Sequence, residues 1–233
     1  MTRPTPDPVP DSTPGPAADP TLDPASARAA GPTLDPATAP VPDPALPPAA
    51  AGRVIVLTGP PGAGKSTVAR LLTQRLTPSV HLHGDDFWSF LVQGAVLPYL
   101  PAAQRQNEVV VGVLAEAAFG YADGGYQVVC DGVIGPWFVG AFRAAARTRD
   151  TELHYVVLRP DQDTTLRRAT GRGADALTDP EPVRAMHRQF AAIEEFEAHV
   201  LDSSRLTPEA TADAVLRGVD GRTFLLGVPA DRP

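Results

Sequence analysis

Apolar residues gather in four short runs that predict buried β-strands. The runs lie at Val54–Leu57, Val80–His83, Tyr126–Cys130 and Leu153–Leu158. An apolar run without polar alternation is typical of a strand that is covered on both faces of a parallel sheet. His199–Leu201 is a shorter run that could add a fifth strand.

Between these runs lie longer segments with apolar residues at helical spacing. The predicted helices are Thr67–Leu76, Ala102–Tyr121, Trp137–Arg147, Asp161–Thr170, Pro182–Ala198 and Pro208–Leu216, whereas Phe87–Pro101 is aromatic and irregular. Strands that alternate with helices predict an α/β fold, a three-layer α/β/α sandwich around a mostly parallel five-stranded sheet. Ligands of such sheets bind beyond the carboxyl ends of the strands.

The residues after the first strand match the phosphate-binding pattern G-x-x-x-x-G-K-[ST]. Glycines let successive backbone N–H groups turn toward phosphate oxygens, and the start of the next helix adds its dipole. The lysine would reach the β- and γ-phosphates of ATP, and the serine hydroxyl would bind Mg²⁺. The predicted nucleotide-binding residues are Gly59, Pro60, Pro61, Gly62, Ala63, Gly64, Lys65, Ser66 and Thr67.

The basic residues support this assignment. Of the 20 lysines and arginines, Lys65 is the only lysine. A lysine is a compact point charge, whereas an arginine is a broad planar fork, so a tight phosphate loop favours the former. The lone lysine thus stands where the chemistry requires one.

Composition divides the chain into three parts. Of 27 prolines, 15 lie between Pro4 and Pro48, among alanine, aspartate and threonine. With little apolar bulk to bury, residues 1–52 are expected to be a disordered tail, either a linker or a proline-rich docking segment. Residues 53–218 would form the phosphate-loop domain, with a lid near 171–179, and residues 219–233 a C-terminal extension.

Charge and cysteine content limit the possible partners and compartment. The net charge is −7, of which six aspartates against Arg3 and Arg28 place −4 in the tail, leaving about −3 for the domain. This charge does not suggest a nucleic-acid partner. The chain has no apolar run long enough to span a membrane, and its single cysteine, Cys130, fits a reducing cytoplasm.

Three classes of phosphate-loop protein can be compared. A GTPase would need a second lysine for its guanine motif, which this chain lacks. An AAA-type ATPase shares the loop sequence G-P-P-G-x-G-K, but it would carry a glutamate after the aspartate that ends the third strand. Here Asp131 is followed by Gly132. Asp131 and Ser66 could hold Mg²⁺; the alternative for Asp131 is a turn-forming Asp-Gly pair.

The third class is the small-molecule kinases, and two segments resemble them. Gly84-Asp85-Asp86-Phe87-Trp88 resembles the segment after the second strand in gluconate kinase and in the uridine kinase and phosphoribulokinase group. Leu166–Arg172, with Leu177, Pro182 and Gln189-Phe190, resembles the gluconate kinase lid, and chloramphenicol phosphotransferase is similar in general plan. The resemblance implies a nucleoside, shikimate or gluconate kinase-like fold and an Asp85 that faces the acceptor hydroxyl.

These segments supply the remaining catalytic candidates. Asp85 follows a strand at the phosphate end of the sheet, where it could accept a hydroxyl proton or hold Mg²⁺; otherwise it caps a helix. Arg168 and Arg172 share a helix face and could stabilise the transferring phosphoryl group or contact the nucleotide. The alternative for the two arginines is a solvated basic face.

An acceptor pocket could be lined by aromatic and polar residues around the Phe87–Asn107 segment. The candidates are Trp88, Tyr99, Arg105, Asn107 and Trp137, although aromatic residues are also common in a core. The sequence predicts a monomeric or homodimeric kinase that transfers the ATP γ-phosphate to a hydroxyl of a sugar acid, nucleoside or antibiotic. The alternative is an AAA-type ATPase or an ATP-binding regulatory protein.

Overall fold

The computed structural model describes residues 52–171, 177 and 179–227. Apart from Gly52, the expected N-terminal tail lies outside these residues. So do Arg172 and most of the expected lid. Among the described residues, no helix is long and apolar enough to cross a membrane.

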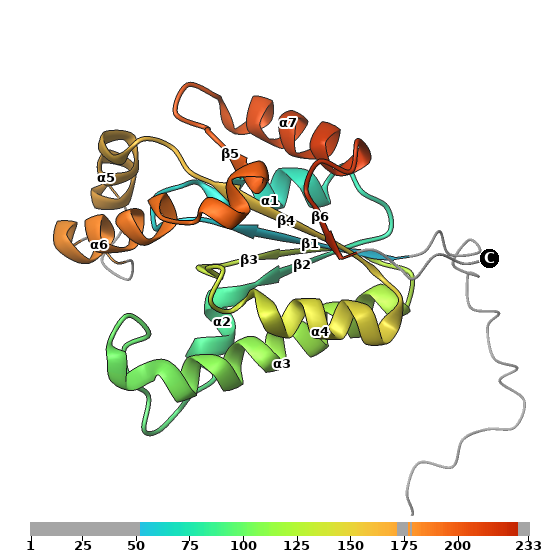
Figure 1. Cartoon of the computed structure of the whole chain (residues 1–233), viewed down its shortest axis with the longest axis horizontal. Coiled ribbons are helices and arrows are strands. Elements are labelled where there is room, and N and C mark those ends of the chain that lie inside the picture. Colours follow the sequence, from blue (N-terminus) through green and yellow to red (C-terminus); the bar gives the residue numbers. More distant parts are fainter. Residues whose placement is uncertain (1–51, 172–176, 178, 228–233) are drawn as a thin grey trace, which may run out of the picture. The chain divides into compact units, whose positions relative to one another are not determined.

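A mixed sheet forms the centre of the described domain (Figure 1). Its five parallel strands run in the order β2-β3-β1-β4-β5. Their bounds are β1 (Arg53–Thr58), β2 (Ser79–His83), β3 (Gln127–Asp131), β4 (Glu152–Leu158) and β5 (Val200–Leu201). All five predicted strands are therefore present. The central strand β1 is buried along nearly its whole length, as its continuous apolar run indicates.

The sheet has one strand beyond the five that were predicted. Strand β6 (Leu225–Gly227) pairs antiparallel with β4, so the expected C-terminal extension contributes to the sheet. Helix α7 (Pro208–Asp220) also runs past residue 218, the expected domain end. Phe224, just before β6, is 5% exposed and packs into the core, which explains why the chain continues onto the sheet.

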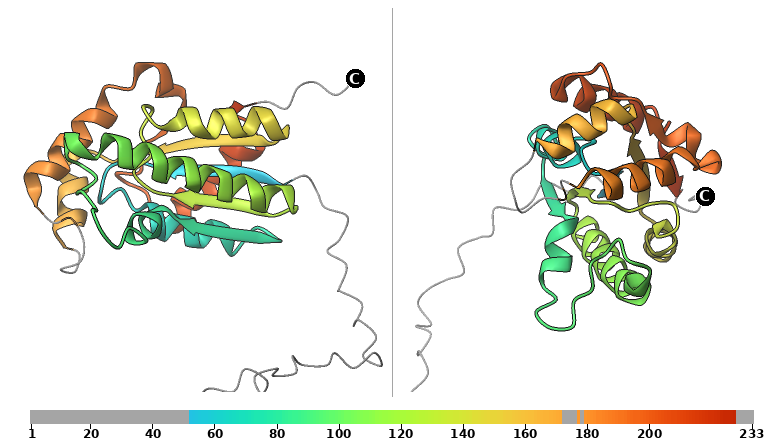
Figure 2. Two further views of the ribbon diagram at one scale, coloured as in Figure 1. Left: turned by 90° about the horizontal axis from the view of Figure 1, so that it is seen from below. Right: turned by 90° about the vertical axis from the view of Figure 1, so that its left-hand side faces the viewer.

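Helices cover both faces of the sheet and give the expected three layers (Figures 1 and 2). Helix α1 (Lys65–Thr73) and α7 pack on one face, and α3 (Gln104–Asp123) and α4 (Val139–Arg149) on the other. Helices α5 (Gln162–Thr170) and α6 (Pro180–Ala191) pack together at the end where the parallel strands terminate.

Two helical segments differ from the sequence-based expectation. Helix α2 (Gly84–Ser89) begins directly after β2 and extends into Phe87–Pro101, the segment that was expected to be irregular. The 3-10 helix η1 (Pro101–Ala103) begins at the end of that segment and precedes α3. The helix expected over Pro182–Ala198 ends at Ala191, and the 3-10 helix η2 (Glu194–His199) follows. This break allows Ile193 and Phe196 to turn into the core, where both are buried.

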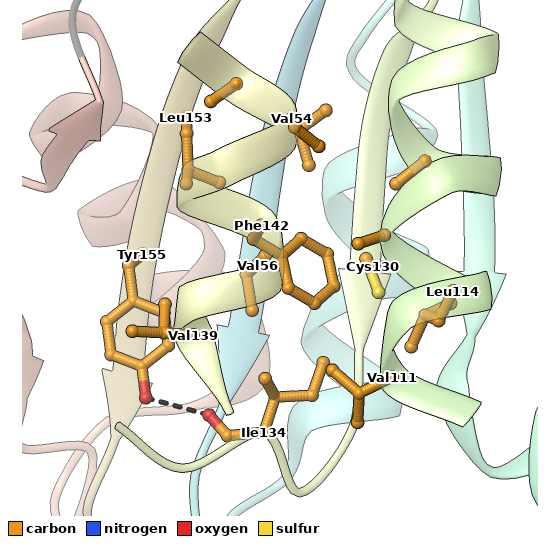
Figure 3. Close-up of a cluster of buried hydrophobic side chains, with 14 of the residues drawn as sticks. Val54, Val56, Val111, Leu114, Cys130, Ile134, Val139, Phe142, Leu153 and Tyr155 are labelled. Atoms are coloured by element: carbon orange, nitrogen blue, oxygen red, sulfur yellow. Dashed lines mark hydrogen bonds between the residues drawn. The ribbon is translucent and has the colours of Figure 1, made fainter. Parts of the chain in front are cut away.

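The core on the α3/α4 face positions the loop that follows β3 (Figure 3). The buried Tyr155 hydroxyl donates to the Ile134 carbonyl at 2.8 Å, and the Ile134 N–H donates to Thr58 Oγ1 at 2.9 Å. Because both backbone groups of Ile134 are held, the β3–α4 loop is fixed against the end of β1. Cys130 is buried in the same cluster, and burial raises the pKa of its thiol, so it acts as a small core residue.

Candidate active site

The phosphate loop connects β1 to α1 and has the backbone geometry that its glycines allow. Gly59 and Gly62 have φ values of 142° and 87°. A Cβ added to Gly59 would lie 2.1 Å from the Leu158 carbonyl oxygen, and one added to Gly62 would lie 2.4 Å from that of Thr165. Only glycine permits this close approach to β4 and α5, which brings both elements beside the loop.

Lys65 is the first residue of α1, and its side chain bends back over the loop. Its Nζ donates to the carbonyl oxygens of Gly59 at 3.0 Å and Pro60 at 3.2 Å. The ammonium group is thereby held on the side of the loop where phosphates bind in the predicted mode. The start of α1 also directs its free N–H groups and the positive end of its dipole toward this point.

Asp131, at the end of β3, is held through both carboxylate oxygens. Ser66 Oγ donates to Asp131 Oδ2 at 2.6 Å, and His81 Nε2 lies 2.6 Å from Oδ1. Asp131 is 1% exposed. Burial alone would raise its pKa, but the hydrogen bonds from His81 and Ser66 more than offset this and lower it. Asp131 is thus a charged carboxylate beside the loop, rather than only a turn residue.

Oxygen atoms suited to Mg²⁺ gather at this point. Mg²⁺ prefers oxygen ligands and keeps several waters, so one or two protein oxygens together with phosphate oxygens usually suffice. The Ser66 hydroxyl and the Asp131 carboxylate lie in contact at the foot of the loop and fit this need. Among the described residues, no group of three or more His, Cys, Asp or Glu side chains could hold a metal ion by itself.

A cavity of about 380 Å³ opens over the phosphate loop. Its floor is the loop and the start of α1, and its sides come from α5 and from the chain around the start of α7. The lining residues outside the loop include Asp85, Arg168, Ser203, Leu206, Pro208 and Thr211. The volume lies within the range of small-molecule sites. The predicted Arg168 is half-buried and lines this cavity, whereas Arg167 is exposed and donates to Thr164 Oγ1.

A second, larger cavity of about 1250 Å³ adjoins the first, with which it shares lining residues. It is lined by α2, the 98–101 segment, the start of α3, the β3–α4 loop and α6. Four of the predicted acceptor residues line it: Trp88, Tyr99, Asn107 and Trp137. Leu177, from the expected lid, lines it as well.

Asp85 and Lys65 line both cavities. Asp85 is exposed and lies in the first turn of α2, whose N-cap is His83, so the helix-cap alternative for Asp85 is not found. His83 lies 3.0 Å from Asp86, not from Asp85. The Asp85 carboxylate is therefore placed where a group in one cavity could meet a group in the other.

Arg105 was expected to line the acceptor pocket and does not. It is exposed on α3 and is not among the residues around the second cavity. Successive helix residues are about 100° apart, so Arg105 and the inward-facing Asn107 lie on different faces. Asn107 lines the cavity, but its side-chain amide already accepts from Trp88 Nε1 at 2.9 Å and donates to the Pro98 carbonyl at 2.8 Å.

Sequence reasoning missed several residues of the site. His81 was assigned no role, although its strand lies next to the strand that ends in Asp131. His83, Gln104 and Met186 also line the second cavity without having been singled out. Gln189, which was quoted only as part of the lid resemblance, lines it too.

Comparisons with known proteins give the family and the fold of the chain. The family model described as AAA domain matches residues 54–196. This match is consistent with the G-P-P-G-x-G-K sequence of the phosphate loop, which AAA proteins share. No protein of curated function matches the sequence.

Solved structures with this fold include several kinases. A sugar kinase from Janibacter sp. is 20% identical, with a TM-score of 0.54 over 72% of this chain and 95% of that one. The Deinococcus radiodurans tunicamycin resistance protein is 17% identical, with a TM-score of 0.55 over 77% and 99%. Shikimate kinase from Acinetobacter baumannii, in complex with shikimate, is 19% identical, with a TM-score of 0.53 over 73% and 94%.

These identities establish a shared fold and not a shared substrate. In this chain the fold consists of a six-stranded sheet with helices on both faces and a glycine loop after the central strand. The family match covers the phosphate loop, Asp85, Asp131 and Arg168. The chain therefore belongs to the AAA domain family and has the fold of the P-loop small-molecule kinases.

Proposed function

We propose that the protein transfers the γ-phosphate of ATP to a hydroxyl group of a small molecule. The observation that carries this proposal is that Lys65 and Asp85 line both cavities. The smaller cavity, over the phosphate loop, would hold the nucleotide, and the larger one the acceptor. Phosphoryl transfer would then take place where the two meet.

Each residue has a defined task in this reaction. The acceptor oxygen forms a bond to the γ-phosphorus, the bond to the bridging oxygen breaks, and ADP leaves. Asp85 accepts the hydroxyl proton, while Lys65 and Arg168 stabilise the negative charge on the phosphoryl oxygens. When bound, Mg²⁺ would neutralise phosphate charge. Ser66 and Asp131 would hold it, and Arg172 would join Arg168 over the nucleotide.

The alternative is an AAA-type ATPase or an ATP-binding regulatory protein in which hydrolysis moves a partner. Such a protein needs a group that polarises the attacking water. The position after Asp131 is Gly132, which has no side chain to do so. The open acceptor cavity next to Asp85 favours the kinase.

We also propose that the partner of the protein is this small molecule and not a nucleic acid or a membrane. The protein would act in the cytoplasm as a monomer or homodimer, with ATP and Mg²⁺ as its cofactors. Size-exclusion chromatography with and without ATP bears on the choice between the two classes. A kinase keeps its size, whereas an AAA machine assembles into a ring.

The experiment that tests the function is acceptor-dependent release of ADP. Sugars, sugar acids, nucleosides and hydroxylated antibiotics are supplied singly with Mg²⁺-ATP, and the Lys65→Ala variant serves as the control for contaminating kinases. At least one class of acceptor should raise ADP release well above the rate without acceptor. Hydrolysis that no acceptor accelerates would favour the ATPase instead.

A further inference from the structure

The second cavity has walls that are mainly aromatic and alkyl. Its aromatic side chains are Trp88 from α2, Tyr99 from the 90–100 segment, and Trp137 and Phe138 from the β3–α4 loop. Met186 of α6 adds a flexible thioether. Because these side chains come from separate parts of the chain and converge on one space, their surfaces form a built apolar wall rather than a scattered set of exposed residues.

Trp88 can present only its ring to a ligand in this cavity. Its indole N–H, the one polar group of the side chain, donates to Asn107 Oδ1 at 2.9 Å. Asn107 is 5% exposed and is fixed in turn by its hydrogen bond to the Pro98 carbonyl. The ring is therefore held in one orientation, and its remaining surface suits an apolar or aromatic group.

Trp137 is held by packing against other aromatic rings. Its ring lies 5.7 Å from that of Phe190, which is buried in the core, and 6.3 Å from that of Phe138. Trp137 itself remains 47% exposed. An aromatic side chain that is packed on one side and open on the other is a rigid surface that costs little conformational entropy when a ligand binds.

Some polar side chains of the cavity already interact with neighbouring protein side chains. Glu181 forms ion pairs with Arg188 at 3.1 Å and Arg184 at 3.7 Å. Gln104 Nε2 donates to Glu108 Oε1 at 2.9 Å. Asp85 lies toward the phosphate loop and is the group proposed to meet the reacting hydroxyl. The volume of about 1250 Å³ exceeds the upper end of the usual range for drug-sized ligands, which is about 1000 Å³.

We infer that the acceptor is a hydroxyl compound with a substantial aromatic or alkyl part, which packs against Trp88 and Trp137 while its hydroxyl lies at Asp85. This inference rests on the proposed kinase function. It assigns Asn107 the role of a positioning residue that orients Trp88, in place of the direct acceptor contact expected from sequence. A compact sugar acid would leave most of this wall without a contact.

The first test compares acceptors in matched pairs that differ only in an apolar group. Suitable pairs are phenyl β-glucoside with methyl β-glucoside, and the phenyl ether of glycerol with the methyl ether of glycerol; gluconate serves as the compact acid. The phenyl member should show at least about a tenfold higher kcat/KM for ADP release, which corresponds to about 1.4 kcal/mol of apolar contact. Equal values within each pair, or a clear preference for gluconate, would overturn the inference.

Binding is measured separately from transfer. Both tryptophans of the chain line the cavity, so intrinsic tryptophan fluorescence reports on it. The phenyl probes should change this fluorescence with Mg²⁺ and a non-hydrolysable ATP analogue present, and their partners should not. If the phenyl probes bind but never accelerate ADP release, the kinase proposal fails and the cavity assignment stands. If no phenyl probe binds, the cavity assignment fails.

The second test changes the wall itself. For a phenyl acceptor, Trp88→Ala should raise KM about tenfold and leave KM for ATP unchanged, whereas Trp88→Phe, which keeps a ring, should stay within about threefold. Asn107→Ala should resemble Trp88→Ala. Phe90→Ala is the matched control, because Phe90 is 69% exposed just beyond α2 and does not line the cavity.

The pattern among these variants identifies the role of the tryptophan. A fold defect would weaken ATP and acceptor together, whereas the inferred role affects the acceptor alone. The inference is wrong if Trp88→Ala leaves the acceptor KM within about twofold of the wild-type value. It is also wrong if Phe90→Ala raises that KM as much as Trp88→Ala does.

Discussion

His81 Nε2 lies 2.6 Å from Asp131 Oδ1, although the strand register pairs Asp131 with His83. His81 stands two residues earlier on β2, on the same side as His83, and its side chain reaches forward to the end of β3. Since Ser66 holds the other oxygen, the carboxylate is fixed by two neighbours. Its orientation is therefore set before any ligand binds, as expected for a group that helps to hold a metal ion.

The first prediction concerns Asp131 and the metal. Asp131→Asn removes the negative charge, but its amide can still accept from Ser66 and contact His81, so the fold should be kept. The Mg²⁺ concentration that gives half of the maximal ADP release should rise about 10–100-fold, the usual cost of altering a group that supports a metal. The same shift should appear in the Mg²⁺ dependence of the melting temperature with ATP present. An unchanged Mg²⁺ requirement would refute the metal role.

The second prediction concerns the lone lysine. Mg²⁺-ATP at about a hundred times its dissociation constant should stabilise the wild-type protein by about 2.7 kcal/mol. Lys65→Ala should remove most of this stabilisation and leave the ligand-free stability nearly unchanged, because the ammonium group donates to loop carbonyls and Lys65 is not a member of either core cluster. Lys65→Arg should fail as well, since the guanidinium is too broad for the loop. Thermal unfolding with and without nucleotide measures all three, and an active arginine variant would contradict the argument.

The predictable parts of the structure were those with a strong local signal. The apolar run of β1 is buried on both faces, and the glycine pattern of the phosphate loop required close approach of the backbone to Leu158 and Thr165. Each signal lies within a few consecutive residues, although the contacts that it leads to are made with distant parts of the chain. The five parallel strands and the phosphate-binding end of the sheet could therefore be derived from the sequence alone.

The missed features depend on contacts between distant segments. Leu225–Gly227 is too short for a period to be seen, and it becomes a strand because β4 offers it an unpaired edge. Asn107 was expected to contact the acceptor, but its amide is used by Trp88 and Pro98, from a segment that the sequence indicates only as irregular. Arg105 was included because of its charge, although the helix turns it outward.

The third prediction concerns Phe224, which lies just before β6, the strand that was not predicted from the sequence. Phe224 is 5% exposed; its carbonyl accepts from the Tyr155 N–H at 2.9 Å, and its ring lies against Gly218. Phe224→Ala should lower the free energy of unfolding by about 3–5 kcal/mol, the usual cost of removing a buried phenyl ring. Urea unfolding measures this loss. A loss below about 1 kcal/mol would show that this segment is not needed for the core.

The fourth prediction concerns His154 and pH. His154 is fully buried on β4; Nε2 lies 3.4 Å from Glu152 Oε2, and Nδ1 finds no hydrogen-bond partner among the described residues. Burial lowers its pKa below the ordinary value of 6.5, and Glu152 offsets this only in part. Since the unfolded chain then takes up the proton more readily, stability should fall as the pH drops below about 6.5.

A matched variant isolates this effect. His154→Leu places an apolar side chain of similar size at this buried position and cannot be protonated, so its free energy of unfolding should fall less than that of the wild-type protein between about pH 7.5 and pH 5.5. Comparison of the two proteins cancels the other titrating groups, including His199, whose pKa burial also lowers. Parallel curves for the two proteins would show that His154 is not the group responsible.

The last prediction concerns Asp85, which lines both cavities and is exposed to them. The Asp85→Asn amide has nearly the same shape and lies outside the phosphate loop, so the affinity for ATP should hardly change. A general base typically accelerates a reaction by about 10²–10⁴-fold, so the rate of transfer to a productive acceptor should fall by this factor in Asp85→Asn. ADP release without acceptor should fall much less, because it does not use the acceptor hydroxyl.

Asp86 provides the control, since it adjoins Asp85 on α2, lies 3.0 Å from His83 and lines neither cavity. Asp86→Asn should keep the transfer rate within about threefold of the wild-type value. Single-turnover measurements with and without acceptor give both rates for both variants. Equal loss in the two reactions of Asp85→Asn would instead make Asp85 a support for the metal ion. If neither reaction slows, Asp85 is not the base, and the proton of the acceptor hydroxyl must leave by another route.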